Sequence, residues 1–198
     1  LAQGYKNHPD TLALLQQSAR FDLDWEVRDT AIVQLAQGYK DHPDTLALLQ
    51  QSARSDKDSF VRGRAIEQLV KAYKHHPDTL AILQQSACSA FYSDVRGKAI
   101  EQLAEVWHDR VAWPTANQPW LFEFLCVRVA ALSEHRTLND PFERKKSWID
   151  NPRQVALQAI LKYYPNHSQT RSLLQDRAEH DPDPKLREFA QGQLATLR

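Results

Sequence analysis

A 34-residue repeat constrains this sequence more than any other feature. The segment Leu1–Arg20 returns as Leu35–Arg54 with a single difference, Asn7 against Asp41, and a third copy begins at Leu69. Near-identical copies carry identical apolar stripes, and a unit of this length cannot bury its stripe alone. The sequence therefore predicts a solenoid in which each unit packs against the next.

Each unit divides into two expected helices. The first begins at a His-Pro-Asp-Thr motif, which occurs at residues 8–11, 42–45 and 76–79. Proline suits the first turn of a helix, and aspartate there faces the positive end of the helix dipole. The second helix begins near Asp24 or Asp58 and carries an apolar residue at every fourth position from Val27 to Tyr39. We expect an all-α fold, a right-handed α-solenoid of helical hairpins with about ten helices.

The repeats also predict the domain organisation. We expect one solenoid over residues 1–198, with units 1–34, 35–68, 69–102, 103–159 and a C-terminal cap at 160–198. The fourth unit has 57 residues, 23 more than the period, and the surplus includes Asn139-Asp140-Pro141, a start signal for a short extra helix. Because Leu1 matches Leu35 in the middle of an expected second helix, we also expect a fragment of a longer chain.

A motif recurs at the start of four expected second helices, an apolar residue followed by Arg-x2-Ala-x3-Leu. Its arginines are Arg28, Arg62, Arg96 and Arg187. This motif resembles the short bacterial form of the HEAT repeat family. In that family a turn aspartate and this arginine commonly pair between neighbouring repeats. The resemblance therefore implies a structural ladder that joins these arginines to Asp24, Asp58 and Asp183. The third repeat has Tyr92 at the aspartate position, so its rung depends on Asp94. Tetratricopeptide repeats share the period, but their Trp-x2-Leu-Gly-x2-Tyr signature is missing.

Charge and composition limit the partner class. The 25 basic and 25 acidic side chains cancel, which disfavours a nucleic-acid groove. The most apolar run is far shorter than the ~20 residues that span a bilayer, so we expect no membrane partner. Cys88 and Cys126 have no second cysteine at metal or redox spacing, which indicates buried thiols in a reducing, cytoplasmic compartment.

The sequence offers no assembled catalytic or metal site. Histidine recurs at one repeat position, in His8, His42, His76 and His167. Packed helices lie on the order of 10 Å apart, whereas zinc needs its ligands at ~2 Å, so these histidines are expected to cap or pack helix starts. No phosphate loop or nucleophile elbow is present. We therefore expect no enzyme activity, no cofactor and no metal. Gly63 and Gly97 are interpreted as sites of tight helix packing.

The expected binding surface lies where the repeats differ. Stacking positions are nearly constant between repeats, whereas positions on the second helix and its preceding turn change in charge and aromatic content. Tryptophan, tyrosine and arginine dominate interface hot spots. The candidate protein-binding residues are Trp25, Phe60, Arg64, Phe91, Tyr92, Lys98, Trp113 and Trp148.

A narrower resemblance rests on several segments. They are the repeated Leu-Ala-Gln-Gly-Tyr-Lys, Phe122-Glu-Phe-Leu-Cys126, Asn139-Asp-Pro-Phe-Glu-Arg144, Asn151-Pro-Arg-Gln-Val-Ala156 and Leu174-Gln-Asp-Arg-Ala178. Together they resemble the C-terminal repeat region of cyanobacterial NACHT-domain (STAND) NTPases. The resemblance implies a sensor or scaffold arm of a signalling NTPase, with antiviral defence as one setting, whose NTPase domain lies outside this sequence. Two alternatives stay open, a phycobilin lyase-like HEAT protein and, less favoured, a nucleic-acid-binding HEAT protein.

Overall fold

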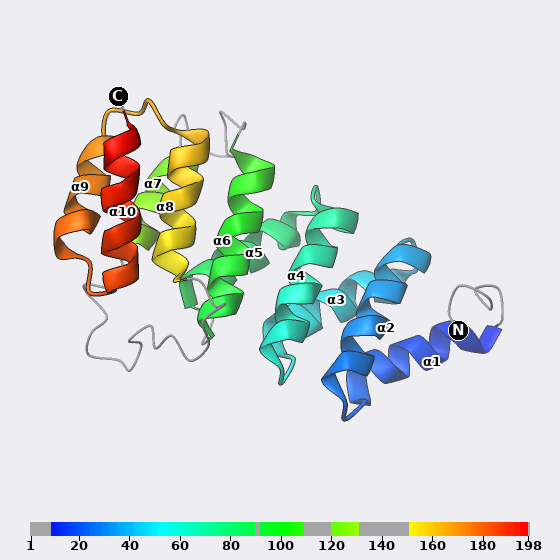
Figure 1. Cartoon of the computed structure of the whole chain (residues 1–198). Coiled ribbons are helices and arrows are strands. Elements are labelled where there is room, and N and C mark those ends of the chain that lie inside the picture. The colour runs from blue at the N-terminus through cyan, green and yellow to red at the C-terminus, as the bar shows by residue number, and fades with distance from the viewer. Residues whose placement is uncertain (1–8, 90–91, 109–119, 131–150, 198) are drawn as a thin grey trace. The chain divides into compact units, whose positions relative to one another are not determined.

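The computed structural model describes residues 9–89, 92–108, 120–130 and 151–197, and every regular element within them is a helix (Figure 1). The helices are α1 (Pro9–Phe21), α2 (Trp25–Gly38), α3 (Pro43–Ser55), α4 (Ser59–Tyr73), α5 (Pro77–Ser89), α6 (Ser93–Trp107), α7 (Trp120–Ala130), α8 (Pro152–Tyr163), α9 (Thr170–His180) and α10 (Pro184–Thr196). The predicted all-α fold of helical hairpins is confirmed. The short helix expected near Asn139 lies outside the described residues.

The chain divides into two compact units, residues 1–102 and 103–198. This division coincides with the expected boundary between the third and fourth repeats. A single solenoid over all five repeats stays a prediction.

Helix starts follow from proline and aspartate. Pro43, Pro152 and Pro184 each occupy the first turn of a helix, where the missing N–H of proline costs nothing. Asp24 and Asp58 precede α2 and α4, and each carboxylate accepts the backbone N–H two residues later, at 2.9 and 2.8 Å. These caps satisfy amides that a helix leaves unpaired, and they fix where each second helix begins.

Unit 1 is a stack of hairpins. Helix α1 packs on α2, and α3 packs on α4, so the two helices of each of these hairpins share their apolar stripes. Helices α2 and α4 also pack against each other and run side by side in Figure 1. The buried residues of α2 include Ala31, Ile32 and Leu35, which lie at the three- and four-residue spacing of one helix face. The apolar stripe of α2 is therefore buried by packing both within its hairpin and against the next hairpin.

Unit 2 repeats the hairpin arrangement with α7 on α8 and α9 on α10, while α8 also contacts α9. Its core contains Leu121, Leu125 and Ile160, all buried. Phe122 is also buried, and its ring lies 3.6 Å from the His167 ring, centroid to centroid. This histidine therefore belongs to the packing of unit 2.

Two expectations about the cysteines and the glycines need correction. Cys88 is exposed and Cys126 is half-buried, so the expectation of two buried thiols is wrong, because α5 turns Cys88 away from its apolar stripe. A Cβ atom at Gly63 would lie 4.0 Å from the Cγ of Lys98, an ordinary contact distance. Tight packing therefore does not explain Gly63.

In the described part of the chain, no helix combines the length and the apolar character that crossing a membrane requires.

Candidate interaction surface

The tightest link between neighbouring hairpins in unit 1 joins Arg28 of α2 to Asp56 at the end of α3. The Nε and Nη2 atoms of Arg28 donate to the two carboxylate oxygens at 3.0 and 2.9 Å, and its Nη1 donates to the carbonyl of Asp22 at 2.9 Å. Both side chains are buried. The hydrogen bond from Asp56 outweighs the opposing effect of burial and raises the pKa of Arg28. This buried, bidentate pair fixes the register between the first two hairpins.

Unit 2 contains the same link between Arg153 and Asp181. The Nε and Nη2 atoms of Arg153 donate to the carboxylate at 3.0 and 2.8 Å, and the two residues are again 28 apart in sequence. Arg177 adds a longer contact from its Nη1 to Asp181 at 3.4 Å. The constant separation of 28 residues is a sequence signal that would have identified both pairs.

For Arg28 the expected ladder aspartate is wrong by two residues, because Asp56 accepts the guanidinium in place of Asp58. Asp24, Asp58 and Asp183 cap their own helices, so a carboxylate oxygen of each is turned to the backbone. The carboxylates that receive arginine belong to the first aspartate of each Asp-x-Asp turn, Asp56 and Asp181. That residue follows the first helix of its hairpin, and its side chain faces the preceding repeat.

The ladder arginines Arg62 and Arg187 each donate to a backbone carbonyl. Nη1 of Arg62 donates to the carbonyl of Asp56, and its guanidinium lies 4.5 Å from the centroid of the Tyr92 ring. The position 28 residues after Arg62 is Ala90, which cannot accept a guanidinium. Arg187 donates to the carbonyl of Asp181 at 2.6 Å. Arg96 is buried at the start of α6.

The expected substitute for the missing aspartate of the third repeat, Asp94, makes a different contact. Its carboxylate accepts the hydroxyl of Ser59 at 2.6 Å and the backbone N–H of Val95 at 2.9 Å. The link between α4 and α6 at this point is therefore a hydroxyl–carboxylate hydrogen bond.

A chain of ion pairs links the second helices of unit 1. The guanidinium of Arg64 bridges Asp29 of α2 at 3.0 Å and Glu67 of its own helix at 2.9 Å. The ammonium of Lys98 on α6 bridges the same Glu67 at 3.0 Å and Glu101 at 2.8 Å. We call these five residues the charge chain. Arg64 and Lys98, expected to face a partner, are thus engaged by neighbouring repeats, and a partner contact by either stays a prediction.

Electrostatics in the charge chain favour the ionised forms. Burial alone would raise the pKa of Glu67, but the hydrogen bond and charge of Lys98, with the charge of Arg64, lower it below its ordinary value. Burial works against the charge of Lys98 as well, and its hydrogen bonds to Glu101 and Glu67 raise its pKa. Glu67 is therefore the central acceptor that couples α4 to α6.

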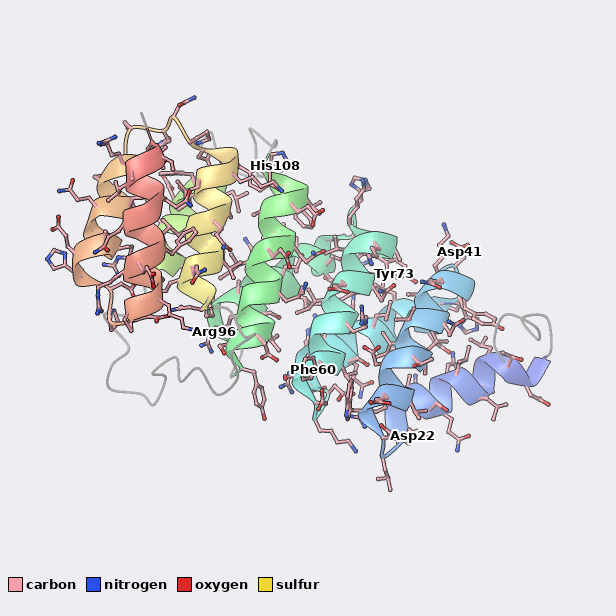
Figure 2. The ribbon with its side chains drawn as sticks, viewed as in Figure 1. Asp22, Asp41, Phe60, Tyr73, Arg96 and His108 are labelled. Carbon is pink, nitrogen blue, oxygen red and sulfur yellow. The ribbon has the colours of Figure 1, made fainter. Side chains whose placement is uncertain are left out.

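Exposed aromatic side chains gather at the start of the second helices. The rings of Trp25 and Phe60, from successive repeats, lie 5.6 Å apart, and the Tyr92 ring covers Arg62. Figure 2 shows Phe60 at the same end of unit 1 as Asp22. We call Trp25, Phe60 and Tyr92 the aromatic edge. The other aromatic candidates, Phe91, Trp113 and Trp148, lie outside the described residues.

The opposite end of the second helices is held differently. Figure 2 places Asp41 and Tyr73 there, and the hydroxyl of Tyr73 donates to the carbonyl of Lys40 in the preceding repeat. Burial and the nearby charge of Asp41 raise the pKa of Tyr73. The tyrosine hydroxyl therefore bonds to the preceding repeat, and the aromatic residues at this end, Tyr39, Tyr73 and Trp107, are half-buried or buried.

A cavity of about 260 Å³ lies between the ends of α1 and α3. Buried Ala19 and Leu48 line it together with the Arg28–Asp56 pair. Arg20 and Lys57, both exposed, also line it, and neither forms an ion pair within the described residues. A space of this size admits one large side chain, and its two cations favour a carboxylate nearby.

The repeated histidines cap helix starts. The Nδ1 atoms of His42 and His76 accept the backbone N–H of Asp44 and Asp78, both at 3.3 Å. His167 accepts from Gln169 at 3.4 Å, and His8 lies outside the described residues. The described residues contain no group of three or more His, Cys, Asp or Glu side chains placed to hold a metal ion.

One comparison with known proteins finds a match for the repeats. A family model described as HEAT repeats matches residues 11–104, which include most of α1, all of α2 to α5 and most of α6. No curated protein and no solved structure matches the sequence. The matched segment contains the Arg28–Asp56 link, the charge chain and the aromatic edge. Residues 11–104 are therefore similar to HEAT repeats, which commonly serve as protein-interaction or scaffold modules.

Proposed function

We propose that this chain is a protein-interaction module whose partner binds along the aromatic edge of unit 1. The observation that carries the proposal is the exposure of three aromatic side chains at the same end of successive repeats. Trp25 is 41% exposed, Phe60 is 45% exposed and Tyr92 is 42% exposed. Aromatic side chains that are partly exposed on a rigid scaffold provide contact area at little cost in conformational entropy.

The surroundings of the aromatic edge favour a polypeptide partner. Phe21, at the end of α1, and Leu23, in the turn before Trp25, are both exposed, which extends the apolar area. The cavity between the ends of α1 and α3 offers space for one side chain, with Arg20 and Lys57 at its border. A peptide with an apolar side chain and a carboxylate would satisfy both features, whereas a phosphate backbone would meet the aspartates of the turns. The edge therefore supports protein recognition better than nucleic-acid recognition.

The finer proposal concerns the parent protein, and it rests on the resemblance of the repeats to the C-terminal region of NACHT-domain NTPases. In this proposal the chain is the sensor or scaffold arm of a signalling NTPase and carries no catalytic residue itself. Sequencing the coding region upstream of Leu1 tests it. A phosphate-binding Gly-x4-Gly-Lys-Ser/Thr loop there would support the proposal, and an unrelated domain would exclude it.

The binding site is tested with variants of the tagged chain. Wild type and the double variant Trp25→Ser/Phe60→Ser would be used to capture proteins from a lysate of the source cells. Val127→Ser is the matched control, because Val127 is an exposed apolar residue of unit 2. We expect a set of captured proteins that the double variant loses and the control keeps, with similar helical content by circular dichroism. An unchanged set for the double variant would place the site elsewhere.

The two alternatives have direct assays. A phycobilin lyase-like protein would shift and sharpen the visible absorption of an added bilin, and a nucleic-acid binder would retard labelled DNA or RNA at low salt. Under the proposed function neither effect is expected from the wild-type chain. A bilin absorption shift, or a retarded band that disappears as salt is raised, would replace the proposal with the corresponding alternative.

A further inference from the structure

Identical sequences in this chain have different surroundings. Residues 9–20 and 43–54 have the same sequence, yet Leu14 of α1 is 61% exposed, whereas its counterpart Leu48 of α3 is 1% exposed. The second helices show the same contrast, since Val27 is 39% exposed and its counterpart Val61 is fully buried. The difference cannot come from local sequence at Leu14. It comes from the neighbour that α3 and α4 have.

That neighbour is the hairpin of α1 and α2. Helix α3 contacts both α1 and α2, and α4 packs against α2. Leu48 lines the same cavity as Ala19 of α1 and Arg28 of α2, so it faces the preceding hairpin. Among the described residues, no hairpin stands in the same relation to Leu14 and Val27.

The aspartate after the first helix of each hairpin shows the same contrast between the first hairpin and later ones. Asp56 and Asp181 each receive a bidentate arginine from the hairpin before them. Asp22 holds the equivalent position, its carboxylate accepts the backbone N–H of Asp24 at 2.9 Å, and its carbonyl accepts Arg28. No guanidinium within the described residues donates to the Asp22 carboxylate. One side of hairpin α1–α2 therefore combines an apolar surface with an aspartate arranged like the two that bind arginine. We call Leu14, Asp22 and Val27 the end face.

We propose that the end face is a docking site for one further HEAT-type hairpin, from outside the described residues, whose second helix carries an arginine in the Arg-x2-Ala-x3-Leu pattern. The occupant is specified by the contact that α1–α2 makes with α3–α4. Its arginine binds Asp22 as Arg28 binds Asp56, and its apolar stripe covers Leu14 and Val27. This proposal does not depend on the aromatic edge, which lies at the helix starts.

The repeat supplies a direct test. A copy of residues 35–68 placed before Leu1 keeps the 34-residue period, because Leu1 then follows Gln68 as Leu69 does. Arg62 of the added copy stands 28 residues before Asp22, the separation between Arg28 and Asp56. We expect the extended chain to melt at a higher temperature. Leu14→Ala should leave the melting temperature of the original chain nearly unchanged and lower that of the extended chain by roughly 5 °C or more.

Matched variants separate docking from a general effect of length. Leu48→Ala should be destabilising in both chains, and Leu23→Ala, at a position that is 88% exposed, should be silent in both. Asp22→Asn should lower the melting temperature of the extended chain alone. If Leu14→Ala and Asp22→Asn remain silent in the extended chain, the end face does not accept such a hairpin and the proposal is wrong.

A labelling measurement serves if the melting transitions are broad. In a background of Cys88→Ser and Cys126→Ser, Leu14→Cys should react quickly with a maleimide in the original chain and at least tenfold more slowly in the extended chain. Equal rates would overturn the proposal. Sedimentation of the original chain tests a second copy as occupant. Self-association that Leu14→Glu abolishes would replace the hairpin with that copy.

Discussion

The guanidinium of Arg28 and the carboxylate of Asp56 form two parallel hydrogen bonds between successive hairpins, at 3.0 and 2.9 Å. The same aspartate receives the Nη1 of Arg62 on its carbonyl and the backbone N–H of Asp58 on its carboxylate. One residue thus joins the preceding repeat, its own second helix and its own turn. Loss of its charge partner leaves a buried carboxylate, which is far more costly than loss of an exposed ion pair.

Arg28→Ala is expected to lower the free energy of unfolding by about 3–5 kcal/mol, because it strands the buried carboxylate of Asp56. Arg62→Ala removes a hydrogen bond to a carbonyl and the contact with Tyr92, and its cost should be about 1–2 kcal/mol. Arg54→Ala, at an exposed position, should stay within about 0.5 kcal/mol of wild type. Urea unfolding followed by circular dichroism measures all three, and equal losses for Arg28→Ala and Arg62→Ala would contradict this ranking.

The charge chain should make stability depend on salt and pH. Because the folded-state pKa of Glu67 is lowered, its contribution is present above the unfolded pKa and is lost as the pH falls through the folded-state value. The raised pKa of Lys98 has the opposite sense, so its contribution is present below the unfolded pKa and is lost as the pH rises through the folded-state value. Glu67→Gln should flatten the acid side of the stability profile, measured as urea midpoints against pH.

Each partly exposed ion pair in the charge chain is expected to contribute only about 0.2–1 kcal/mol at low salt. Glu26→Gln is the control for Glu67→Gln, because Glu26 is exposed on α2 and lies outside the charge chain. Joint reversal by Arg64→Glu and Lys98→Glu should place these side chains opposite Asp29, Glu67 and Glu101 and lower stability. A double reversal without effect on the urea midpoint in low salt would show that the charge chain is not formed in solution.

Two glycines within helices should be replaceable with a gain in stability. A Cβ atom at Gly192 of α10 would have no heavy atom within 4 Å, and one at Gly63 would meet only Lys98 Cγ at 4.0 Å. Gly192→Ala and Gly63→Ala should each raise the free energy of unfolding by up to about 1 kcal/mol through helix propensity. Glu188→Gly, at an exposed position of α10, should lower it. A loss of stability in Gly63→Ala would restore the tight-packing interpretation.

The two cysteines should differ in reactivity. Cys88 is exposed, whereas Cys126 is half-buried, and burial together with the charge of Glu123 raises the pKa of the Cys126 thiol. Since the thiolate is the reacting form, Cys126 should react several-fold more slowly with a disulfide reagent at neutral pH. Cys88→Ser should remove the fast phase and Cys126→Ser the slow phase. A single fast phase that accounts for both thiols would contradict the burial of Cys126.

Local signals in the sequence were sufficient to predict the helices. Pro43 and Pro77 mark helix starts, and the stripe through Ala31 and Leu35 is buried as its spacing predicts. These features depend on residues close in the chain, where proline geometry and helical periodicity decide the outcome. The fold class could therefore be predicted without any knowledge of contacts between repeats.

Contacts between repeats were harder to predict from the sequence. Asp56 and Asp58 are the same residue type, two positions apart, and only their orientation decides which caps a helix and which binds Arg28. Likewise, Arg64 varies between repeats as a binding residue would, but its variation accompanies its ion pair with Asp29. Sequence variation between repeats cannot by itself distinguish a partner contact from a contact that is specific to two neighbouring repeats.

The separation of 28 residues between Arg28 and Asp56 lies within a period of 34. Suppose that the gene gains a second copy of residues 35–68 directly after the first. Arg28 is then still followed, 28 residues later, by Asp56, and Arg62 of the first copy is followed at the same distance by Asp56 of the second, with no compensating substitution. Such a chain can lengthen its stack by one hairpin while the Arg28–Asp56 contact stays as it was, and the near identity of Leu1–Arg20 and Leu35–Arg54 is what such a step leaves behind.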